Sequence, residues 1–159
     1  MEYISSYKSP LGYLIIKSDG ESVTQIAFSE NDLAEKDECA ILQQCEQQLD
    51  DYFCGKSLEF DLPLNPCGTE FQKRVWAELL TIPKGQTITY HELAVRLGDP
   101  KCIRAAGTAN GRNPLAIVIP CHRVIGAGNK LTGYAGGLSR KLWLLEHEMK
   151  YHPAKNTLF

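Results

Sequence analysis

A cysteine and a histidine stand next to each other at Cys121 and His122, directly after Pro120 and an apolar run over residues 115–119. A thiol is a useful nucleophile only as the thiolate, which forms near neutral pH when a base or a positive charge lies close by. The imidazole of His122 is such a base, and it needs an acceptor on its far nitrogen to orient it. Glu148, at the margin of an apolar helix face, is a candidate for that acceptor.

The spacing of this pair bears on how the proton would move. Residues 115–119 (LAIVI) have the β-branched, unbroken apolar character of a buried strand. Neighbouring side chains of an extended strand point to opposite faces, so His122 would not face the Cys121 thiol directly. Either the chain turns at Pro120-Cys121, or a water molecule relays the proton, and the adjacency favours the relay.

The elements that must position these residues fall into two groups. The first third of the chain predicts a small antiparallel sheet, from β-branched or aromatic runs near residues 3–7, 13–18 and 22–29 that turn signals separate. Apolar residues at helical spacing over residues 37–53 predict one helix, which Gly55 ends. The composition changes at residues 66–68, so we expect two domains, 1–67 and 68–159.

The second domain is predicted to be mostly helical. Thr69 begins a first helix with a capping box to Gln72, and a second box at residues 89–92 begins a short helix that ends at Gly98. Asp99 and the proline after it begin a third helix at once. A final helix is expected to begin after Ser139 as its cap, with residues 142, 145 and 149 as its inner row. The sequence therefore predicts a mixed α+β protein.

The second and third helices have the spacing of a helix-turn-helix. The third helix is predicted to expose small residues and one arginine, which suits close approach to a nucleic-acid groove. The alternative is that the small residues merely permit tight helix packing. The residues concerned are Lys101, Arg104, Ala105, Ala106, Gly107, Thr108 and Ala109.

Charge and cysteine content narrow the class of protein. Residues 1–67 hold 4 Lys/Arg and 13 Asp/Glu, so their formal charge is −9. Residues 68–159 hold 13 Lys/Arg and 6 Asp/Glu, so theirs is +7. Such asymmetry is a hint of nucleic-acid contact by the basic part, although a solvated surface explains it equally well. Six cysteines without zinc-type spacing or a signal peptide favour free thiols in a cytoplasmic protein, with no metal and no cofactor.

Several motifs in order carry a family resemblance. Pro120-Cys121-His122-Arg123 follows Asn113-Pro114 and precedes Tyr134-Ala135-Gly136-Gly137 and a Trp143-to-Glu148 helix. Together with the helix that carries Arg104, this resembles the methylated-DNA-protein-cysteine methyltransferases, the O6-alkylguanine-DNA alkyltransferases. The resemblance runs from about Phe71 to Glu148, and it implies a ribonuclease H-like layout before a winged helix-turn-helix-like domain.

The resemblance also implies a role for single residues. Cys121 would accept the alkyl group from O6 of guanine, with His122 acting through a water and Glu148 orienting it. Tyr90 would polarise and help to flip the base, Arg104 would be the finger that replaces it, and Asn113 would be a hinge. The remaining implied contacts with DNA or the base are Tyr134, Ala135, Arg123, Ala105, Ala106, Gly107 and Thr108.

The implied function is stoichiometric, irreversible repair of O6-alkylguanine, and of O4-alkylthymine, in double-stranded DNA by a monomer. Two alternatives remain open at this point. One is a module that binds alkylated bases without chemistry, and the other is a cysteine hydrolase that uses Cys121 and His122. The zinc ligands of some relatives have no counterpart, because no histidine precedes His91.

Overall fold

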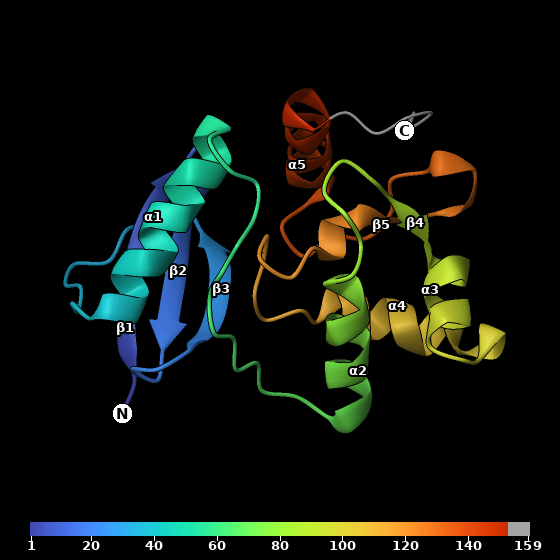
Figure 1. The fold of residues 1–159 in the computed structure, drawn as a ribbon, viewed down its shortest axis with the longest axis horizontal. Helices are drawn as coiled ribbons and strands as arrows, with labels where there is room; N and C mark the ends of the chain where they lie inside the picture. The colour runs from blue at the N-terminus through green and yellow to red at the C-terminus, as the bar shows by residue number, and fades with distance from the viewer. Residues whose placement is uncertain (153–159) are drawn as a thin grey trace. The chain divides into compact units, whose positions relative to one another are not determined.

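The protein, seen in a computed structural model that describes residues 1–152, has the mixed α+β architecture that the sequence predicts. Its residues cluster into two compact units. The first contains Met1–Cys67 together with Pro114–Val118, and the second contains Gly68–Asn113 and the chain from Ile119 onward. Figure 1 traces the course of the chain through both units.

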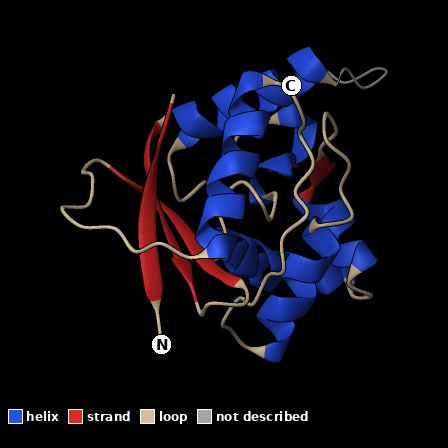
Figure 2. Cartoon of the chain, turned by 60° about the vertical axis from the view of Figure 1, so that its left-hand side comes forward, coloured by secondary structure: helices blue, strands red, loops and turns tan. Residues whose placement is uncertain are grey.

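The first unit is a three-stranded antiparallel sheet and one helix. The strands β1 (Tyr3–Ser9), β2 (Gly12–Ser18) and β3 (Val23–Ser29) pair in the order β1-β2-β3. Helix α1 (Ala40–Cys54) packs across the sheet, as Figures 1 and 2 show, and Gly55 ends it in the left-handed conformation with φ 82°. The predicted sheet, helix and helix stop are therefore confirmed.

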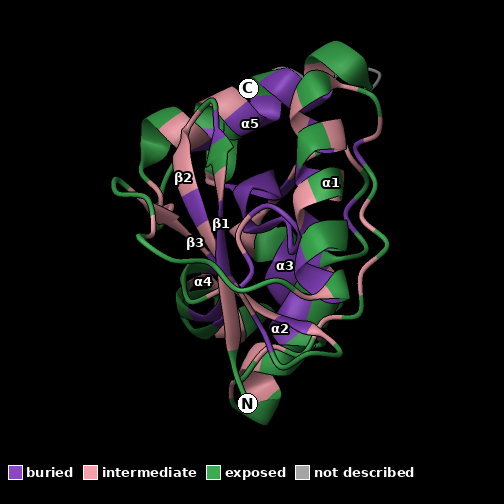
Figure 3. Ribbon diagram, turned by 90° about the vertical axis from the view of Figure 1, so that its left-hand side faces the viewer, coloured by how far each residue is buried: buried purple, intermediate pink, exposed green. Residues whose placement is uncertain are grey.

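The core of this unit is apolar because the strands and the helix pack their apolar faces together. Every second residue of a strand points to that face, and on the helix the apolar residues recur every three or four positions. The outer face of α1 is largely exposed, as the green segments in Figure 3 indicate. The fully buried apolar side chains of the sheet and helix are Leu14, Ile16, Val23, Leu42, Cys45, Leu49 and Tyr52.

The second unit is built mainly from helices. It also holds two short strands that pair in parallel, Ile88 with Val124 and Thr89 with Ile125, which the sequence analysis did not predict. The elements in chain order are α2 (Glu70–Leu79), β4 (Ile88–Thr89), α3 (Tyr90–Arg96), η1 (Pro100–Cys102), α4 (Ile103–Gly111), η2 (Cys121–Arg123), β5 (Val124–Ile125), η3 (Ala127–Asn129) and α5 (Leu138–Tyr151).

Local capping explains where these helices begin. The Thr69 and Gln72 side chains form a reciprocal capping box at α2, as predicted. At α3 the Thr89 side chain accepts from the Glu92 amide, and at η1 the Asp99 side chain accepts from the Lys101 amide. Asp99 therefore begins a 3-10 turn that leads into α4, which follows Cys102 without a side-chain cap of its own, and α3 and α4 form the helix-turn-helix pair.

Two local predictions are wrong. Residues 115–119 are buried except for half-buried Ala116, but they form no strand. Only Leu115 pairs, in a single bridge to Ile26, before Ile117 adopts φ 73°. Burial explains the apolar character of this run. Its backbone makes local hydrogen bonds of a turn, such as Val118 N–H to the Ala116 carbonyl, instead of the ladder of a sheet. Helix α5 begins at Leu138 after Gly137, and Ser139 does not cap it.

The inner face of α5 also differs from the expected row. Leu142 is 36% exposed and only Leu145 of the expected three is buried. The buried residues are Lys141, Leu144, Leu145, His147 and Glu148, so the helix is rotated by about one residue relative to the prediction. Within residues 1–152, no helix is long and apolar enough to cross a membrane.

Candidate active site around Cys121

A tight turn delivers Cys121. The Cys121 amide donates to the Ile119 carbonyl at 2.8 Å around Pro120, whose φ of −82° and ψ of 61° are those of an inverse γ-turn. The chain then continues as one turn of 3-10 helix over Cys121–Arg123. The chain therefore turns at Pro120, and the prediction that Cys121 and His122 are neighbours on an extended strand is wrong. Their adjacency in sequence does not by itself favour a water relay.

Two asparagines at the end of α4 hold this turn. Asn113 Nδ2 donates to the Ile119 carbonyl at 2.7 Å, and Asn110 Nδ2 donates to the Cys121 carbonyl at 3.3 Å. The Trp76 indole N–H, on α2, donates to the Ala109 carbonyl at 2.9 Å and steadies the same end of the helix. The helix that carries Arg104 is therefore tied to the backbone on both sides of Pro120.

His122 and Glu148 form a buried pair. His122 Nε2 lies 2.7 Å from Glu148 Oε2, and both side chains are fully buried. The second ring nitrogen, His122 Nδ1, is buried and has no hydrogen-bond partner among the described residues. Since Glu148 occupies Nε2, the atom with free capacity for a proton is Nδ1.

Arg123 completes the buried ion pair with Glu148. Its Nε donates to Oε1 at 2.8 Å and its Nη2 to Oε2 at 2.9 Å, while Nη1 donates to the Ile82 carbonyl at 2.7 Å. Arg123 is only 8% exposed, so its guanidinium orders the carboxylate and is not available to DNA. The expectation that Arg123 contacts DNA is therefore corrected.

The pKa values of the pair reflect these contacts. Burial by itself would raise the pKa of Glu148, but the charges and hydrogen bonds of His122 and Arg123 hold it well below its ordinary value. Burial lowers the pKa of His122 from 6.5, against the opposing effect of Glu148. The imidazole is therefore neutral and able to accept a proton at neutral pH.

Cys121 is 6% exposed, and burial raises the pKa of its thiol to about 11. A hydrogen bond from the Asn113 side chain and the charge of Lys141 act in the opposite direction. In this state the site holds a thiol, so formation of the thiolate requires a proton acceptor at hand.

Two tyrosines lie at the site, Tyr90 on α3 and Tyr134 on the loop between β5 and α5. Tyr90 Oη, at the start of α3, donates to the Thr132 carbonyl at 3.0 Å. Gly107 on α4 lies beside the same ring, where a Cβ would be in ordinary van der Waals contact with Tyr90 Cδ1, at 3.6 Å. Burial raises the pKa of Tyr134, and the charge of Cys121 adds to this effect. Both phenols are therefore neutral donors beside the thiol.

The exposed face of α4 carries the predicted finger. Arg104, Ala105 and Thr108 are exposed and Gly107 is partly exposed. Ala106 and Ala109 are buried, with 0% and 3% exposed, so the predictions that both are exposed and that Ala106 contacts DNA are wrong. One face of α4 packs against the rest of the unit, and the other face is exposed. The small residues Ala106 and Ala109 thus permit tight helix packing, whereas Ala105 and Thr108 lie on the exposed face.

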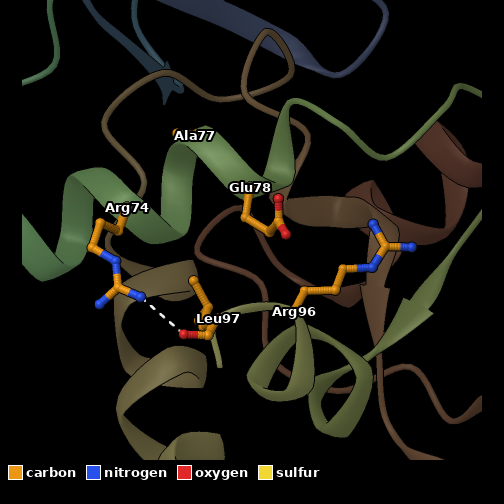
Figure 4. A pocket seen from close by; sticks show the side chains of 5 residues that line it. All are labelled: Arg74, Ala77, Glu78, Arg96 and Leu97. Carbon is orange, nitrogen blue, oxygen red and sulfur yellow. Dashed lines mark hydrogen bonds between the residues drawn. The ribbon is translucent and has the colours of Figure 1, made fainter. Parts of the chain in front are cut away.

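A surface pocket lies apart from these residues, between α2 and α3 (Figure 4). Arg74 reaches across it and donates to the Leu97 carbonyl at the end of α3, at 2.9 Å. A cation on the last carbonyls of a helix is stabilising. Arg74 thus links the end of α3 to α2, and it is one of the residues that line this pocket.

Comparison with known proteins decides the family. Models of the 6-O-methylguanine DNA methyltransferase match the chain twice, the ribonuclease-like domain over residues 3–66 and the DNA-binding domain over residues 70–150. The methylated-DNA--protein-cysteine methyltransferase of Mycobacterium leprae is 45% identical over 164 residues, covering 100% of this chain and 99% of its own. The chain belongs to the 6-O-methylguanine DNA methyltransferase family.

Solved structures agree with this assignment. The O6-methylguanine methyltransferase of Mycobacterium tuberculosis superimposes with a TM-score of 0.86 at 43% identity, over 98% of this chain and 97% of that one. A Mycobacterium tuberculosis OGT solved in complex with DNA gives 0.86 at 44% identity, over 95% of each chain. The predicted family and fold, including a ribonuclease-like part and a DNA-binding part, are confirmed.

In this methyltransferase, the structure brings Cys121, His122, Glu148, Asn113 and the two tyrosines to one site. Sequence reasoning missed Lys141, a fully buried lysine on α5, and Asn110, whose buried Oδ1 has no hydrogen-bond partner within residues 1–152. The signal for Lys141 was its position seven residues before Glu148, which puts both on the same helix face. No comparable signal distinguished Asn110.

Proposed function

We propose that this protein repairs DNA by transferring a methyl or other alkyl group from O6 of guanine, and from O4 of thymine, to its own Cys121. The observation that carries the proposal is the buried His122–Glu148 pair, 2.7 Å apart, directly after the thiol and with Nδ1 left open. The family relationship supplies the substrate class, since the chain matches the methyltransferases over its whole length.

The transfer follows from the protonation states of the site. No described residue, Cys121 included, hydrogen-bonds to His122 Nδ1, so the thiol gives its proton to Nδ1 through a water molecule. Glu148 stabilises the imidazolium that forms. The thiolate sulfur then attacks the alkyl carbon, forming the S–C bond as the C–O6 bond breaks and its electrons remain with guanine. The imidazolium proton returns to the guanine, so that an unmodified base and a thioether result.

The leaving guanine needs donors that stabilise its developing charge. The Tyr90 hydroxyl is one candidate, and the backbone amide of Ala135 on the exposed loop is another. Tyr134 would line the pocket that receives the base. Both phenols keep their protons because burial raises the pKa of each.

The target base must leave the duplex before a buried thiol can reach it. Extrusion costs a few kcal/mol, least for a base that is already poorly paired, which favours the damaged guanine. Arg104 on the open face of α4 is suited to enter the duplex in its place, and Ala105, Gly107 and Thr108 allow close approach to the minor groove. Asn113 would couple this helix to the acceptor turn through its bond to the Ile119 carbonyl.

The division of labour and the setting follow from the same proposal. We assign residues 68–159 to DNA binding and alkyl acceptance, with their formal charge of +7 for phosphate attraction, and residues 1–67 to a structural role. Because a thioether has no evident route back to a thiolate, each molecule acts once. We expect a cytoplasmic monomer whose partner is double-stranded DNA that contains O6-alkylguanine.

Mass spectrometry tests the proposal. The protein is incubated with duplex DNA that contains one O6-methylguanine and is then digested. The Cys121 peptide is expected to gain the mass of one methyl group, with at most one per molecule, while the Cys102 peptide serves as the internal control. Binding of the modified duplex without any gain at Cys121 would indicate a recognition module, and repeated turnover of an ester or amide would indicate a hydrolase.

A further inference from the structure

Lys141 is a buried cation with an unusual set of partners. Its side chain is 0% exposed on the inner face of α5. Nζ donates to three backbone carbonyls, Val124 O at 2.6 Å, Thr132 O at 2.7 Å and Gly133 O at 3.2 Å. All three donors of the ammonium are therefore used, and they join β5 to the loop that precedes Tyr134.

Within the described residues, no carboxylate forms an ion pair with this ammonium. Among residues 1–152, Glu148 pairs with His122 and Arg123, and Lys141 takes part in no ion pair. A buried charge without a counter-ion is costly, and burial accordingly lowers the pKa of Lys141 from 10.5 to about 8. A leucine would fill the same space on α5 at no such cost, so the charge itself calls for an explanation.

The groups near Lys141 belong to the proposed chemistry. Nζ lies 5.8 Å from the centre of the Tyr90 ring, and Tyr90 donates to the same Thr132 carbonyl that Lys141 contacts. The charge of Lys141 lowers the pKa of Cys121, and it also lowers the pKa of His122. One cation thus favours a thiolate on the acceptor and a neutral imidazole on its base.

We propose that Lys141 is a positioning residue for alkyl transfer, which holds the Thr132–Gly133 loop and Tyr90 in place and sets a fixed positive charge beside the Cys121 thiol. The inference rests on the proposed function, because it needs Cys121 as the acceptor. The thiol proton passes to His122, so the ammonium takes no part in proton transfer. It is the counter-charge for the thiolate that this transfer creates.

Three substitutions separate the charge from the hydrogen bonds. Lys141→Arg keeps the charge, Lys141→Gln keeps two donors without the charge, and Lys141→Met removes both. Lys150→Gln is the matched control, because Lys150 lies on the same helix but is exposed. Thermal unfolding of each variant checks that it folds.

Reaction of the free protein with iodoacetamide, followed on the Cys121 peptide, reports the thiolate. At pH 7.5 the rate constant is expected to fall about tenfold or more in Lys141→Gln, which corresponds to one pKa unit or more at Cys121. Lys141→Arg should stay within about threefold of the wild type, and Lys150→Gln should be unchanged. Equal rate constants for wild type and a folded Lys141→Gln would overturn the proposal.

The pH profile of the wild type gives a second readout that does not depend on any variant folding. The ionisable groups that face Lys141 are Cys121, His122 and Tyr90, with Tyr134 in the same loop. His122 titrates below 6.5 and the tyrosines above 10, so only Lys141 loses its charge near pH 8. The rise of the iodoacetamide rate with pH should therefore become shallower above pH 8, and a tenfold rise per pH unit throughout would contradict the inference.

Single-turnover repair of an O6-methylguanine duplex completes the test. Lys141→Met should lose more of the rate constant at saturating DNA than Lys141→Gln, because it also releases the loop. If the wild type itself transfers no methyl group, the proposed function fails whatever Lys141 does. If the wild type transfers normally and Lys141→Met does so equally fast, only the present inference fails.

Discussion

The apolar core of the N-terminal unit and the polar cluster around Cys121 are both buried, yet they are stabilised in different ways. The apolar core is stabilised by the area that it buries and by the fit of its side chains, since burial of apolar surface is favourable in any arrangement that excludes water. Its residues include Leu14, Ile16, Leu42 and Leu49. His122, Arg123, Glu148 and Lys141 need particular partners at particular distances. The proposed chemistry uses these partners, since it needs a charge, a base and a thiol together in a buried site.

The difference teaches that equal burial does not mean equal tolerance of substitution. An apolar core can be repacked at modest cost, whereas removing one member of a buried ion pair leaves an uncompensated charge. Variants of the core should therefore alter stability alone, and variants of the cluster should alter stability and reactivity together.

Glu148→Gln should have the largest effect. It leaves Arg123 and His122 without their shared anion, at a cost of about 3–5 kcal/mol in the free energy of unfolding. The rate of alkyl transfer should fall at the same time, because the imidazolium loses its stabilising carboxylate. Denaturant unfolding and single-turnover repair measure the two effects, and a stable, fully active variant would remove the distinction between the two regions.

The same substitution has a signature in acid. In the wild type the folded-state pKa of Glu148 lies below its ordinary value of 4.5, so its stabilisation is complete above that pH and is lost as the pH falls towards the folded value. The variant lacks this group. The difference in stability between the two proteins should therefore shrink below about pH 4.5, which unfolding curves at pH 7 and pH 3 would show.

Leu49→Ala is the matched variant in the N-terminal core. Leu49 is 0% exposed on α1, and its truncation should cost about 2–5 kcal/mol in the free energy of unfolding. The rate of alkyl transfer per folded molecule should be unchanged at a temperature where the variant remains folded. A slower transfer at full occupancy of the folded state would mean that the first unit contributes to the reaction.

Arg104→Ala tests the exposed face of α4, which belongs neither to the apolar core nor to the buried polar cluster. Repair of O6-methylguanine in a duplex should fall about tenfold or more, because the extruded base leaves an unfilled stack, and unstacking costs a few kcal/mol. Reaction with free O6-benzylguanine should change by less than about twofold. Equal losses with both substrates would argue against the role as a finger.

Thr69→Ala should have the smallest effect. It removes one half of the capping box at α2, at a cost of about 1 kcal/mol in the free energy of unfolding. Thr69 is exposed and distant in sequence from the acceptor turn, so the transfer rate should not change. A large loss of activity would indicate that α2 positions the site more strictly than Trp76 and its bond to the Ala109 carbonyl suggest.

Much of the fold followed from local patterns. Antiparallel strands between turn signals, helix caps at Thr69, Thr89 and Asp99, and the stop at Gly55 depend on interactions within a few residues of each other. The run over residues 115–119 was mistaken for a strand because apolar character reports burial and does not distinguish a strand from a buried turn. Ile117 at φ 73° has no signal of its own, since a β-branched residue is disfavoured there.

The sequence by itself determined which residues of this methyltransferase are proposed to carry the chemistry, since the choice of Cys121, His122 and Glu148 follows from residue type, order and the family motif. The tertiary structure alone decided which atoms meet. Glu148 contacts Nε2 of His122, Arg123 and Ala106 are buried, and the buried Lys141 donates to three backbone carbonyls. The physical reason is that caps and periodicities are local, whereas the partner of a buried charge is chosen by packing between segments far apart in the chain.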